Sequence, residues 1–537
     1  MQFDYIIIGA GSAGCVLANR LTEDSSYNVL LLEAGGKGNR TINIPGAYGT
    51  LHNTAVDWAF FTEPQPYVNN RRLFVPRGKV LGGCSTTNAM AYVRGNPQDY
   101  NEWASFGNNG WSYTEVLSYF KKSEHHERFD EPYHSKKGLL NVSFAKYPSP
   151  LTKVFTEACA EAGIQYNEDY NGEVQLGASL LQYTIKDNRR HSTATAFLAP
   201  AMRRSNLTVR TKVIVKQILI ENDNAVGVEF FTGRTTIEKA YCNKEVILSA
   251  GTIQSPHLLL LSGIGDKETL ANAGIDMKLS LPGVGKNLQD HVLSYTSNLC
   301  SIPTSNNTIK PINMVKGLLQ YLIFNKGPFC NSPIEANAFI KTDSSLTKPD
   351  IQFHFAPFHL GNDYKADPYN IKTYPHNNGF SILAILLHPE SKGHVTLKTN
   401  NAFDPPVIQP CFFQSVNDRS TLLKGLKKAM EVSDTKAFRP FSKDGLYHPC
   451  RDATDEELMF HICKSLETLY HPVGTCKMGN DSMAVVNERL QVHGLKRLRV
   501  IDASIMPTII SGNTNAASIM IGEKGADLIK EDFFANR

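Results

Sequence analysis

The chain has 537 residues, of which 42% are hydrophobic and 20% are charged, a composition typical of an ordinary soluble globular protein. Its net charge of +4 is too small to indicate nucleic acid or an anionic membrane surface as a partner. None of the ten cysteines forms a CxxC pair, so neither a zinc ribbon nor a thioredoxin-type site is indicated. A disulfide framework is not expected in so long a chain, and we expect free thiols in a reducing cytoplasm.

The N-terminal segment MQFDYIIIGAG lacks the basic region, the long apolar stretch and the cleavage site of a signal peptide. The longest apolar runs, such as Phe380 to Leu387, are far shorter than the ~20 residues that a membrane-spanning helix needs. We therefore expect a fold that begins near residue 3 and a cytoplasmic protein without a transmembrane segment. A peripheral location on a membrane is left open.

The first 33 residues predict one β-α-β unit. The β-branched run at 4–8 is typical of a strand that is buried on both faces of a parallel sheet. A helical pattern follows at 15–21, and a second apolar run at 29–32 ends at Glu33.

The turn between the first strand and the helix has the spacing Gly9-x-Gly11-x-x-Gly14. The first glycine allows a tight turn, the second lets a pyrophosphate approach the backbone, and the third lets the helix pack closely on the sheet. The phosphates would lie at the N-terminus of the helix. Glu33, at the end of the second strand, is placed to bind the adenosine ribose. The unit predicts a dinucleotide site, with a structural glycine turn as the alternative.

The remaining elements are predicted in chain order. Residues 40–110 are rich in loops, and helical spacing of apolar residues predicts helices at 113–122, 151–163 and about 517–530. Strand patterns cover 207–249, with a hairpin turn at 222–224.

From about residue 300 to 460 the strand-like segments FIKT, DIQFHFAP, FSILAILLHP and HVTLK predict an antiparallel sheet. The long polar loop at 361–379 lies between them and is interpreted as either a functional lid or a disordered segment.

Three further segments are rich in small residues. RGKVLGGCSTTNAMAYVRG at 77–95 could lie against a flat ring, although a basic surface loop is the plainer alternative. In EVILSAGTIQSPHLLLLSGIG at 245–265 a strand ends at Gly251, and a helix is expected to begin near Pro256 because proline suits the first helical turn. Residues 468–524 contain TLYHPVGTCKMG and LRVIDASIMPTIISGNTNAASIMIGEK.

Together these segments resemble the signatures of the glucose-methanol-choline (GMC) oxidoreductases, which are FAD-dependent alcohol dehydrogenases and oxidases. Within that family the chain is most similar to choline dehydrogenase-like enzymes. Five motifs, including PGVGKNLQDH at 282–291, occur in family order and cover essentially the whole chain.

The resemblance implies an FAD site built from many segments. The implied positions are Gly9, Gly11, Ser12, Ala13, Gly14, Glu33, Ala34, Arg77, Gly82, Gly83, Asn88, Ala91, Val213, Ala250, Gly251, Asp502, Ala503, Asn513, Asn515 and Ala516. Some members of the family attach FAD covalently through a histidine, and the corresponding residue here is Thr87, which implies a non-covalent flavin. Many members have a second active-site histidine where this chain has Asn513.

The same resemblance implies His471 as the general base that takes the proton of the substrate hydroxyl while a hydride leaves for flavin N5. A histidine suits this task because its ordinary pKa of about 6.5 lies near working pH. Asn513 would donate to the substrate oxygen, and both residues would hold the developing alkoxide.

Two residues are weaker candidates for the substrate pocket. Glu335 could attract a trimethylammonium group or serve as a structural partner in the sheet. Phe355 could belong to an aromatic cage, but in a strand it shares a face with Phe353, which core packing explains as well. Cys84 and Cys476 lie close to the motifs and are interpreted as buried packing. No metal site is predicted.

We thus expect an α/β protein, α+β overall, with a Rossmann-like FAD-binding domain and a substrate domain that has an antiparallel sheet flanked by helices. The expected boundaries are 1–145, 186–300 and 466–537 for the first domain, and 146–185 and 301–465 for the second. The expected function is oxidation of a primary or secondary alcohol, choline-like or of small to medium size. A hydroxynitrile lyase or a fatty-acid photodecarboxylase is the alternative. The electron acceptor is open among oxygen, a quinone and a carrier.

Overall fold

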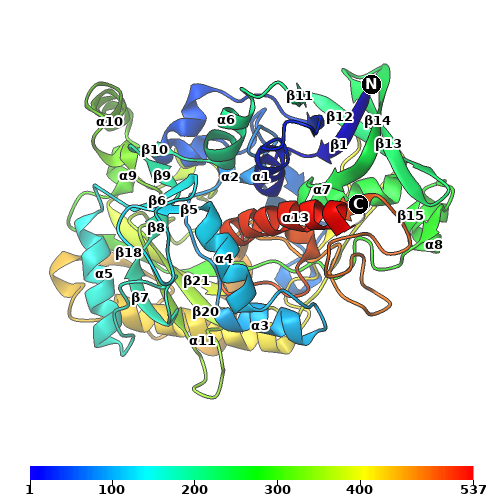
Figure 1. Cartoon of the computed structure of the whole chain (residues 1–537). Coiled ribbons are helices and arrows are strands. Elements are labelled where there is room, and N and C mark those ends of the chain that lie inside the picture. Colours follow the sequence, from blue (N-terminus) through cyan, green and yellow to red (C-terminus); the bar gives the residue numbers. More distant parts are fainter. Residues whose placement is uncertain (536–537) are drawn as a thin grey trace.

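The computed structural model describes residues 1–535 and shows two large β-sheets with helices packed around them (Figure 1). The first sheet contains β1 (Gln2–Ile8), β2 (Val29–Glu33), β11 (Leu207–Thr211), β12 (Val213–Glu221), β13 (Asn224–Thr232), β14 (Thr236–Leu248) and β26 (Leu498–Val500). Its order is β11-β2-β1-β14-β13-β12, with β26 paired to β14. β1 pairs in parallel with β2 and β14, as a dinucleotide-binding sheet requires.

Helices α1 (Ser12–Leu21) and α13 (Asn515–Ala535) pack against each other beside this sheet (Figure 1). The central residues of β1 and β2, Ile6–Ile8 and Leu30–Leu32, are buried, because helices and loops cover both faces of the parallel strands. This arrangement brings the two ends of the chain together around one hydrophobic core.

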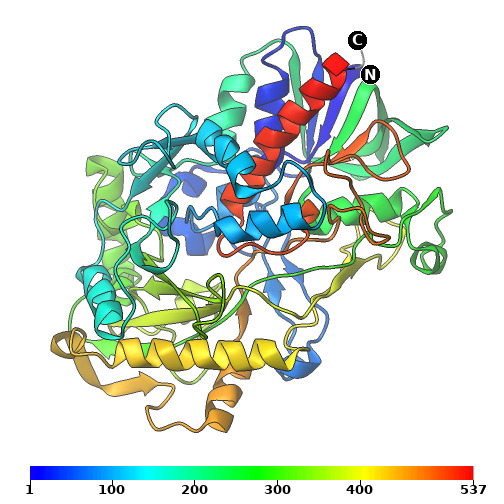
Figure 2. The same ribbon diagram turned by 60° about the horizontal axis from the view of Figure 1, so that its bottom comes forward.

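The second sheet is antiparallel and contains β7 (Gly177–Leu180), β17 (Val292–Tyr295), β18 (Ser297–Cys300), β19 (Ala336–Ile340), β20 (Ile351–Ala356), β21 (Gly379–Leu386), β24 (Ser442–His448) and β25 (Glu467–Thr468). The long helix α11 (Val416–Ser433) runs along this part of the molecule and is the yellow helix in Figure 2. Together with α5 (Pro150–Glu161) and α12 (Asp455–Ser465), it covers a second hydrophobic core.

Shorter elements connect these layers. The remaining helices are α2 (Cys84–Thr87), α3 (Pro97–Ser105), α4 (Tyr113–Ser123), α6 (Ala199–Ala201), α7 (Gly251–Leu261), α8 (Lys267–Asn272), α9 (Ser305–Thr308) and α10 (Pro311–Phe324). The small sheets are formed by β3 (Phe60–Phe61) with β4 (Phe74–Val75), β5 (Glu124–His126) with β6 (Leu140–Phe144) and β8 (Gln182–Tyr183), β9 (Ile185–Lys186) with β10 (Arg189–Arg190), β15 (Ile264–Gly265) with β16 (Leu279–Ser280), and β22 (His394–Thr396) with β23 (Val407–Gln409). Within residues 1–535, no helix combines the length and the apolar content needed to cross a membrane.

The predicted fold class is confirmed, and most predicted elements are present. α4, α5 and α13 lie where helical spacing placed them. The hairpin between β12 and β13 turns at Asn222 and Asp223, whose φ angles of +47° and +59° suit a tight hairpin turn.

Two expectations were wrong. α7 begins at Gly251, and Pro256 lies inside it rather than in its first turn. A proline has no N–H to offer the carbonyl of Thr252 four residues earlier, and that carbonyl accepts the hydroxyl of Thr475 at 2.6 Å instead. The segment HVTLK forms β22, which pairs with β23 in a separate small sheet.

The expected division into domains stays a prediction. β17 and β18 lie inside the segment 186–300 assigned to the FAD-binding domain, yet they hydrogen-bond to β21 of the second sheet. The chain therefore passes from one sheet to the other near residue 291.

Candidate functional site

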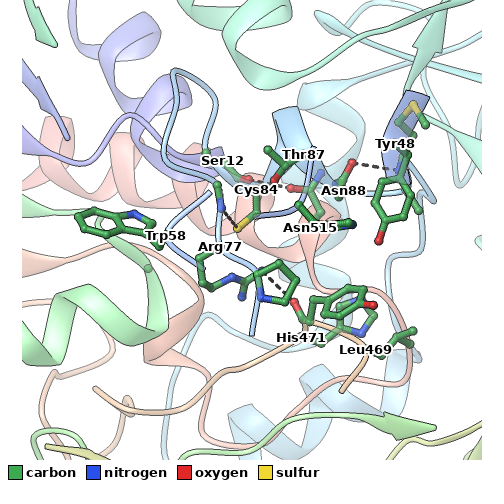
Figure 3. A pocket seen from close by; sticks show the side chains of 18 of the residues that line it. Ser12, Tyr48, Trp58, Arg77, Cys84, Thr87, Asn88, Leu469, His471 and Asn515 are labelled. Carbon is green, nitrogen blue, oxygen red and sulfur yellow. Dashed lines mark hydrogen bonds between the residues drawn. The ribbon is translucent and has the colours of Figure 1, made fainter. Parts of the chain in front are cut away.

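A large cavity of about 460 Å³ lies between the segments that the sequence motifs mark. Its walls include the glycine loop after β1, the segment around Arg77, the start of α7 and the start of α13. Figure 3 shows Ser12, Asn88, Asn515 and His471 around this common space.

The glycine loop has the geometry that a close-lying phosphate needs. Gly9 has a φ of +98°, and a Cβ there would lie 2.5 Å from the carbonyl oxygen of Ser249. A Cβ on Gly14 would lie 1.9 Å from the carbonyl oxygen of Gly9, so this glycine permits the contact between α1 and β1. Gly11 borders the cavity and meets no atom closer than 3.7 Å, which leaves its backbone open to a ligand.

Glu33 lines the same cavity at the end of β2. Its carboxylate accepts backbone N–H groups of Ala10 at 2.9 Å and Gly35 at 2.7 Å, which hold it in place. Burial raises the pKa of Glu33 to about 7. The carboxyl keeps lone pairs for two adjacent hydroxyls of a ribose.

Segments that are distant in the sequence pack against the glycine loop after β1. The N–H of Gly82 donates to the carbonyl of Ala10 at 2.7 Å, and a Cβ on Gly83 would lie 2.8 Å from Cα of Gly11. The hydroxyl of Ser12 donates to Asn515 at 2.7 Å. The segment 77–95 is therefore a wall of the cavity, which rules out the plainer interpretation as a surface loop.

Most of the predicted FAD-binding residues line this cavity. They are Gly9, Gly11, Ser12, Ala13, Glu33, Ala34, Arg77, Gly83, Asn88, Ala91, Val213, Ala250, Gly251, Asp502, Ala503, Asn513 and Asn515. Gly14, Gly82 and Ala516 are not among its lining residues. A Cβ on Gly14 or Gly82 would lie within 2.2 Å of a neighbouring atom, and Ala516 is buried.

His471 lines the cavity and is 8% exposed. Its backbone N–H donates to Asp290 at 2.8 Å, and Asp290 also accepts the hydroxyl of Thr468. Burial lowers the pKa of His471 well below its usual range, and nearby His291, His354 and Arg77 lower it further. The ring is therefore neutral near pH 7.

The tautomer of His471 follows from its neighbour His291. Nε2 of His291 lies 3.0 Å from the carbonyl of Leu387, which can only accept, so Nε2 carries the proton. Burial lowers the pKa of His291 to about 3, so its Nδ1 is an unprotonated acceptor. Nδ1 of His471 lies 2.9 Å from that nitrogen and must donate to it. Nε2 of His471 is then the unprotonated, basic nitrogen.

This basic nitrogen lies beside unpartnered polar atoms. The Nδ2 group of Asn513 lies 3.2 Å from Nε2 of His471 and donates to it. Oδ1 of Asn513 and both ring nitrogens of His354 are buried without a hydrogen bond of standard geometry among the described residues, although Asn513 lies near enough to raise the pKa of His354 against the larger lowering by burial. Both side chains line the cavity. Such atoms indicate a polar ligand that supplies the missing partners.

His291 and His354 were missed from the sequence. His354 lies between Phe353 and Phe355 on β20, so the alternation of a strand places it on the opposite face from that pair. Phe353 and Phe355 pack in the second core, which turns His354 toward the cavity. His291 is the last residue of the motif PGVGKNLQDH, but no spacing rule connects it with His471.

The two candidate substrate residues lie elsewhere. Glu335 does not line the cavity, and its carboxylate accepts the backbone N–H of Ser149 at 2.6 Å and the hydroxyl of Thr152 at 2.5 Å, near the start of α5. Phe355 stacks on Phe155 with ring centroids 5.1 Å apart, in the core. The geometry therefore supports a structural role for Glu335 and core packing for Phe355.

The rest of the cavity wall is mostly apolar and aromatic. One buried cluster contributes Leu293, Tyr295, Ile334, Phe358, Leu360, Tyr374, Leu383 and Leu469. Pro368, Ile371 and Tyr374 come from the loop at 361–379, so this loop closes part of the cavity.

Every carboxylate that lines the cavity in the described structure already has partners. Glu467 pairs with Arg71 at 2.5 Å and accepts the hydroxyl of Tyr369 at 3.0 Å. Asp502 accepts the N–H of Gly251 and the hydroxyl of Ser255, and Glu33 holds two backbone groups as described. Of these three, Glu467 is paired with a cation, and Asp502 and Glu33 are held by hydrogen bonds to neutral groups.

Comparison with known proteins agrees with this arrangement. The family model described as GMC oxidoreductase matches residues 3–293 and 389–522. An alcohol dehydrogenase (acceptor) from Pseudomonas putida is 40% identical over 540 residues, which cover 98% of this chain and 96% of the relative. The mitochondrial choline dehydrogenase of Mus musculus is 38% identical over 541 residues, 98% of this chain and 89% of the relative.

Solved structures show the same fold. The crystal structure of a pyridoxine 4-oxidase from Mesorbium loti superposes with a TM-score of 0.88 at 30% identity and covers 98% of both chains. A formate oxidase, at 24% identity, has a TM-score of 0.91 over 100% of this chain and 99% of its own, which is a likeness of fold alone.

Proposed function

The chain belongs to the GMC oxidoreductase family, and from that membership we propose that it oxidises a neutral alcohol with an apolar body to the aldehyde or ketone. FAD is the cofactor, and His471 is the general base. The observation that supports this role best is the neutral imidazole of His471, which lines the cavity and whose unprotonated Nε2 lies beside Asn513.

The cavity suits FAD in several respects. The glycine loop leaves backbone N–H groups open at the N-terminus of α1, where a pyrophosphate binds. Glu33 suits the adenosine ribose, and small residues of the segment 77–95 leave room for a flat ring. When bound, FAD supplies the acceptor for the hydride of the carbinol carbon.

The side chains of the protein perform the proton chemistry. Nε2 of His471 takes the proton of the substrate hydroxyl as the hydride leaves, and Asn513 and His354 offer hydrogen bonds to the oxygen that becomes negative. The proton that His471 gains makes its ring a cation, and the acceptor nitrogen of His291 stabilises that cation through the Nδ1–H.

We propose that the flavin is not covalently attached, because Thr87 lines the cavity where some family members carry the linking histidine. Precipitation of the purified enzyme with trichloroacetic acid should therefore release essentially all of the yellow colour into the supernatant. The absorbance at 450 nm of pellet and supernatant measures this. Colour that stays in the washed pellet would show a covalent bond.

The composition of the cavity walls supports the proposed substrate class. Aromatic rings alone can attract a quaternary ammonium, but Glu467 in the cavity wall is already paired with Arg71, and Glu335 does not line the cavity. Transfer of an organic cation from water into a cavity with apolar walls is unfavourable when no counter-charge is present. A neutral alcohol with an aliphatic or aromatic body avoids the desolvation of a charge in such a site and gains from the burial of apolar surface.

We expect anaerobic flavin reduction to be more efficient with 1-hexanol, 1-octanol or benzyl alcohol than with choline, by at least about tenfold in the ratio of reduction rate to dissociation constant. Stopped-flow absorbance at 450 nm gives both constants. Equal or better reduction by choline would refute the substrate class but not the reaction. If no alcohol bleaches the flavin, alcohol oxidation itself is wrong.

The same assay in air, with a quinone analogue as the alternative acceptor, distinguishes an oxidase from a dehydrogenase. The relatives named above are dehydrogenases and oxidases, which gives the lyase and decarboxylase alternatives no support. A cytoplasmic location is proposed because all ten cysteines are free thiols.

A further inference from the structure

Helix α10 has an outward face made of large apolar side chains. Six of them are between 51% and 81% exposed, namely Ile312, Val315, Leu319, Leu322, Ile323 and Phe324. Except for Phe324, their spacing in the sequence places them along one side of the helix. Both views place α10 at the edge of the molecule (Figures 1 and 2). A contiguous exposed face of this kind marks an interaction site.

The opposite side of α10 is firmly attached. Gly317 and Tyr321 are buried, and the hydroxyl of Tyr321 donates to the carbonyl of Asn188 at 3.1 Å. A Cβ on Gly317 would lie 3.0 Å from the ring of Phe329, so the missing side chain allows close packing. Met314 lines the cavity. The helix is thus a fixed wall of the site, and its apolar outer face is not the result of loose packing.

The charges around this face are positive. Lys310, Lys316 and Lys326 lie before, within and after α10, and no described ion pair engages them. No acidic residue occurs between Asp290 and Glu335. The local charge therefore differs from that of the whole chain, whose net charge of +4 is spread over 537 residues.

The neighbouring hairpin of β9 and β10 adds to the positive charge. It contacts the end of α10 through Asn325, whose Nδ2 donates to the carbonyl of Asp187 at 3.1 Å. Exposed Lys186 and Arg189 flank that turn and outnumber the single carboxylate of Asp187. An apolar face bordered by cations is the pattern of helices that lie in the interface of an anionic bilayer.

We propose that α10 docks this enzyme on the surface of an anionic membrane, with Ile312, Leu319 and Leu322 in the boundary between headgroups and acyl chains. At 14 residues the helix is too short to span a bilayer and lies along its surface. A second copy of the chain fits this face less well, because a twofold contact would set the same lysines against each other. Docking brings a wall of the substrate cavity to the membrane.

The test uses the holoenzyme and vesicles of phosphatidylcholine with or without 30% phosphatidylglycerol, with sedimentation as the readout. We expect the wild type to sediment with the anionic vesicles. The triple variant Leu319→Asn, Leu322→Asn, Ile323→Asn should partition at least about a hundredfold more weakly. The variant Lys310→Gln, Lys316→Gln, Lys326→Gln should lose roughly fivefold per lysine at low ionic strength.

A matched control removes three exposed apolar side chains that are not on α10, through Val174→Asn, Val416→Asn and Phe460→Asn. This control should sediment like the wild type. Flavin absorbance and activity with a soluble alcohol and a soluble acceptor, unchanged in all variants, show that each is folded, whatever the true substrate class. The proposal is overturned if the wild type does not bind anionic vesicles. It is also overturned if the α10 variant binds them normally, or if light scattering without lipid shows a dimer that only this variant loses.

Discussion

Replacement of His471 by alanine should lower the rate of flavin reduction by about 10²–10⁴-fold while FAD remains bound. The variant lacks Nε2 of His471, the nitrogen that the hydrogen bond to His291 leaves unprotonated beside Asn513 in the described cavity. The glycine loop and Glu33 are untouched, so the flavin spectrum should be unchanged. Stopped-flow absorbance under anaerobic conditions with a saturating alcohol measures the reduction rate.

The control is His493→Gln, a histidine that does not line the cavity and hydrogen-bonds to the carbonyl of Gly479. Its reduction rate should equal that of the wild type. The pH dependence gives an independent readout. Burial lowers the pKa of His471 below 6.5, so the base stays neutral as the pH falls through 6.5 and activity is lost only at lower pH, about tenfold per unit. A His471→Ala enzyme with near wild-type rates would refute the assignment.

Replacement of His291 by leucine should lower the reduction rate about tenfold to a hundredfold with little change in the dissociation constant of the substrate. His291 does not line the cavity and is a positioning residue that acts through His471. Without it the Nδ1–H of His471 is buried and unsatisfied, which costs about 1–3 kcal/mol and favours the tautomer with a proton on Nε2. That tautomer cannot accept the substrate proton.

The conservative variant His291→Asn separates positioning from simple packing. The Oδ1 atom of asparagine can occupy the place of Nδ1 and accept the same hydrogen bond, while the contact with the carbonyl of Leu387 is lost. We therefore expect His291→Asn to reduce the flavin within about tenfold of the wild-type rate and well above the leucine variant. If both variants are equally slow and bind less FAD, the residue is structural. If the leucine variant is as fast as the wild type, the tautomer argument is wrong.

The sequence left two interpretations of the loop at 361–379, and only its contacts in the tertiary structure distinguish between them. The sequence left a lid and a disordered segment as alternatives, since both are polar and long. The structure places Pro368, Ile371 and Tyr374 of this loop in the cavity wall, which favours the lid. Its neighbours in space come from other segments, so composition alone could not place it.

Local requirements explain what the sequence by itself determined. The roles of Gly9, Gly11 and Gly14 follow from backbone geometry over six residues, and the strand before them and the helix after them are visible in the same stretch. The position of Glu33 follows from the length of one β-α-β unit. The helices α4 and α5 lie where they were predicted, because the regular spacing of their apolar residues is visible within one segment.

Only the tertiary structure determined the hydrogen bonds of His471. His291 and His471 are 180 residues apart, and their contact depends on β17 and β25 being neighbours in the second sheet. Strand alternation shows that His354 and Phe355 face opposite sides, but the packing of α5 and α11 decides which side is core and which is cavity. The direction of Glu335 and the exposure of α10 likewise depend on which distant segments cover them, and a pattern along the chain does not contain that information.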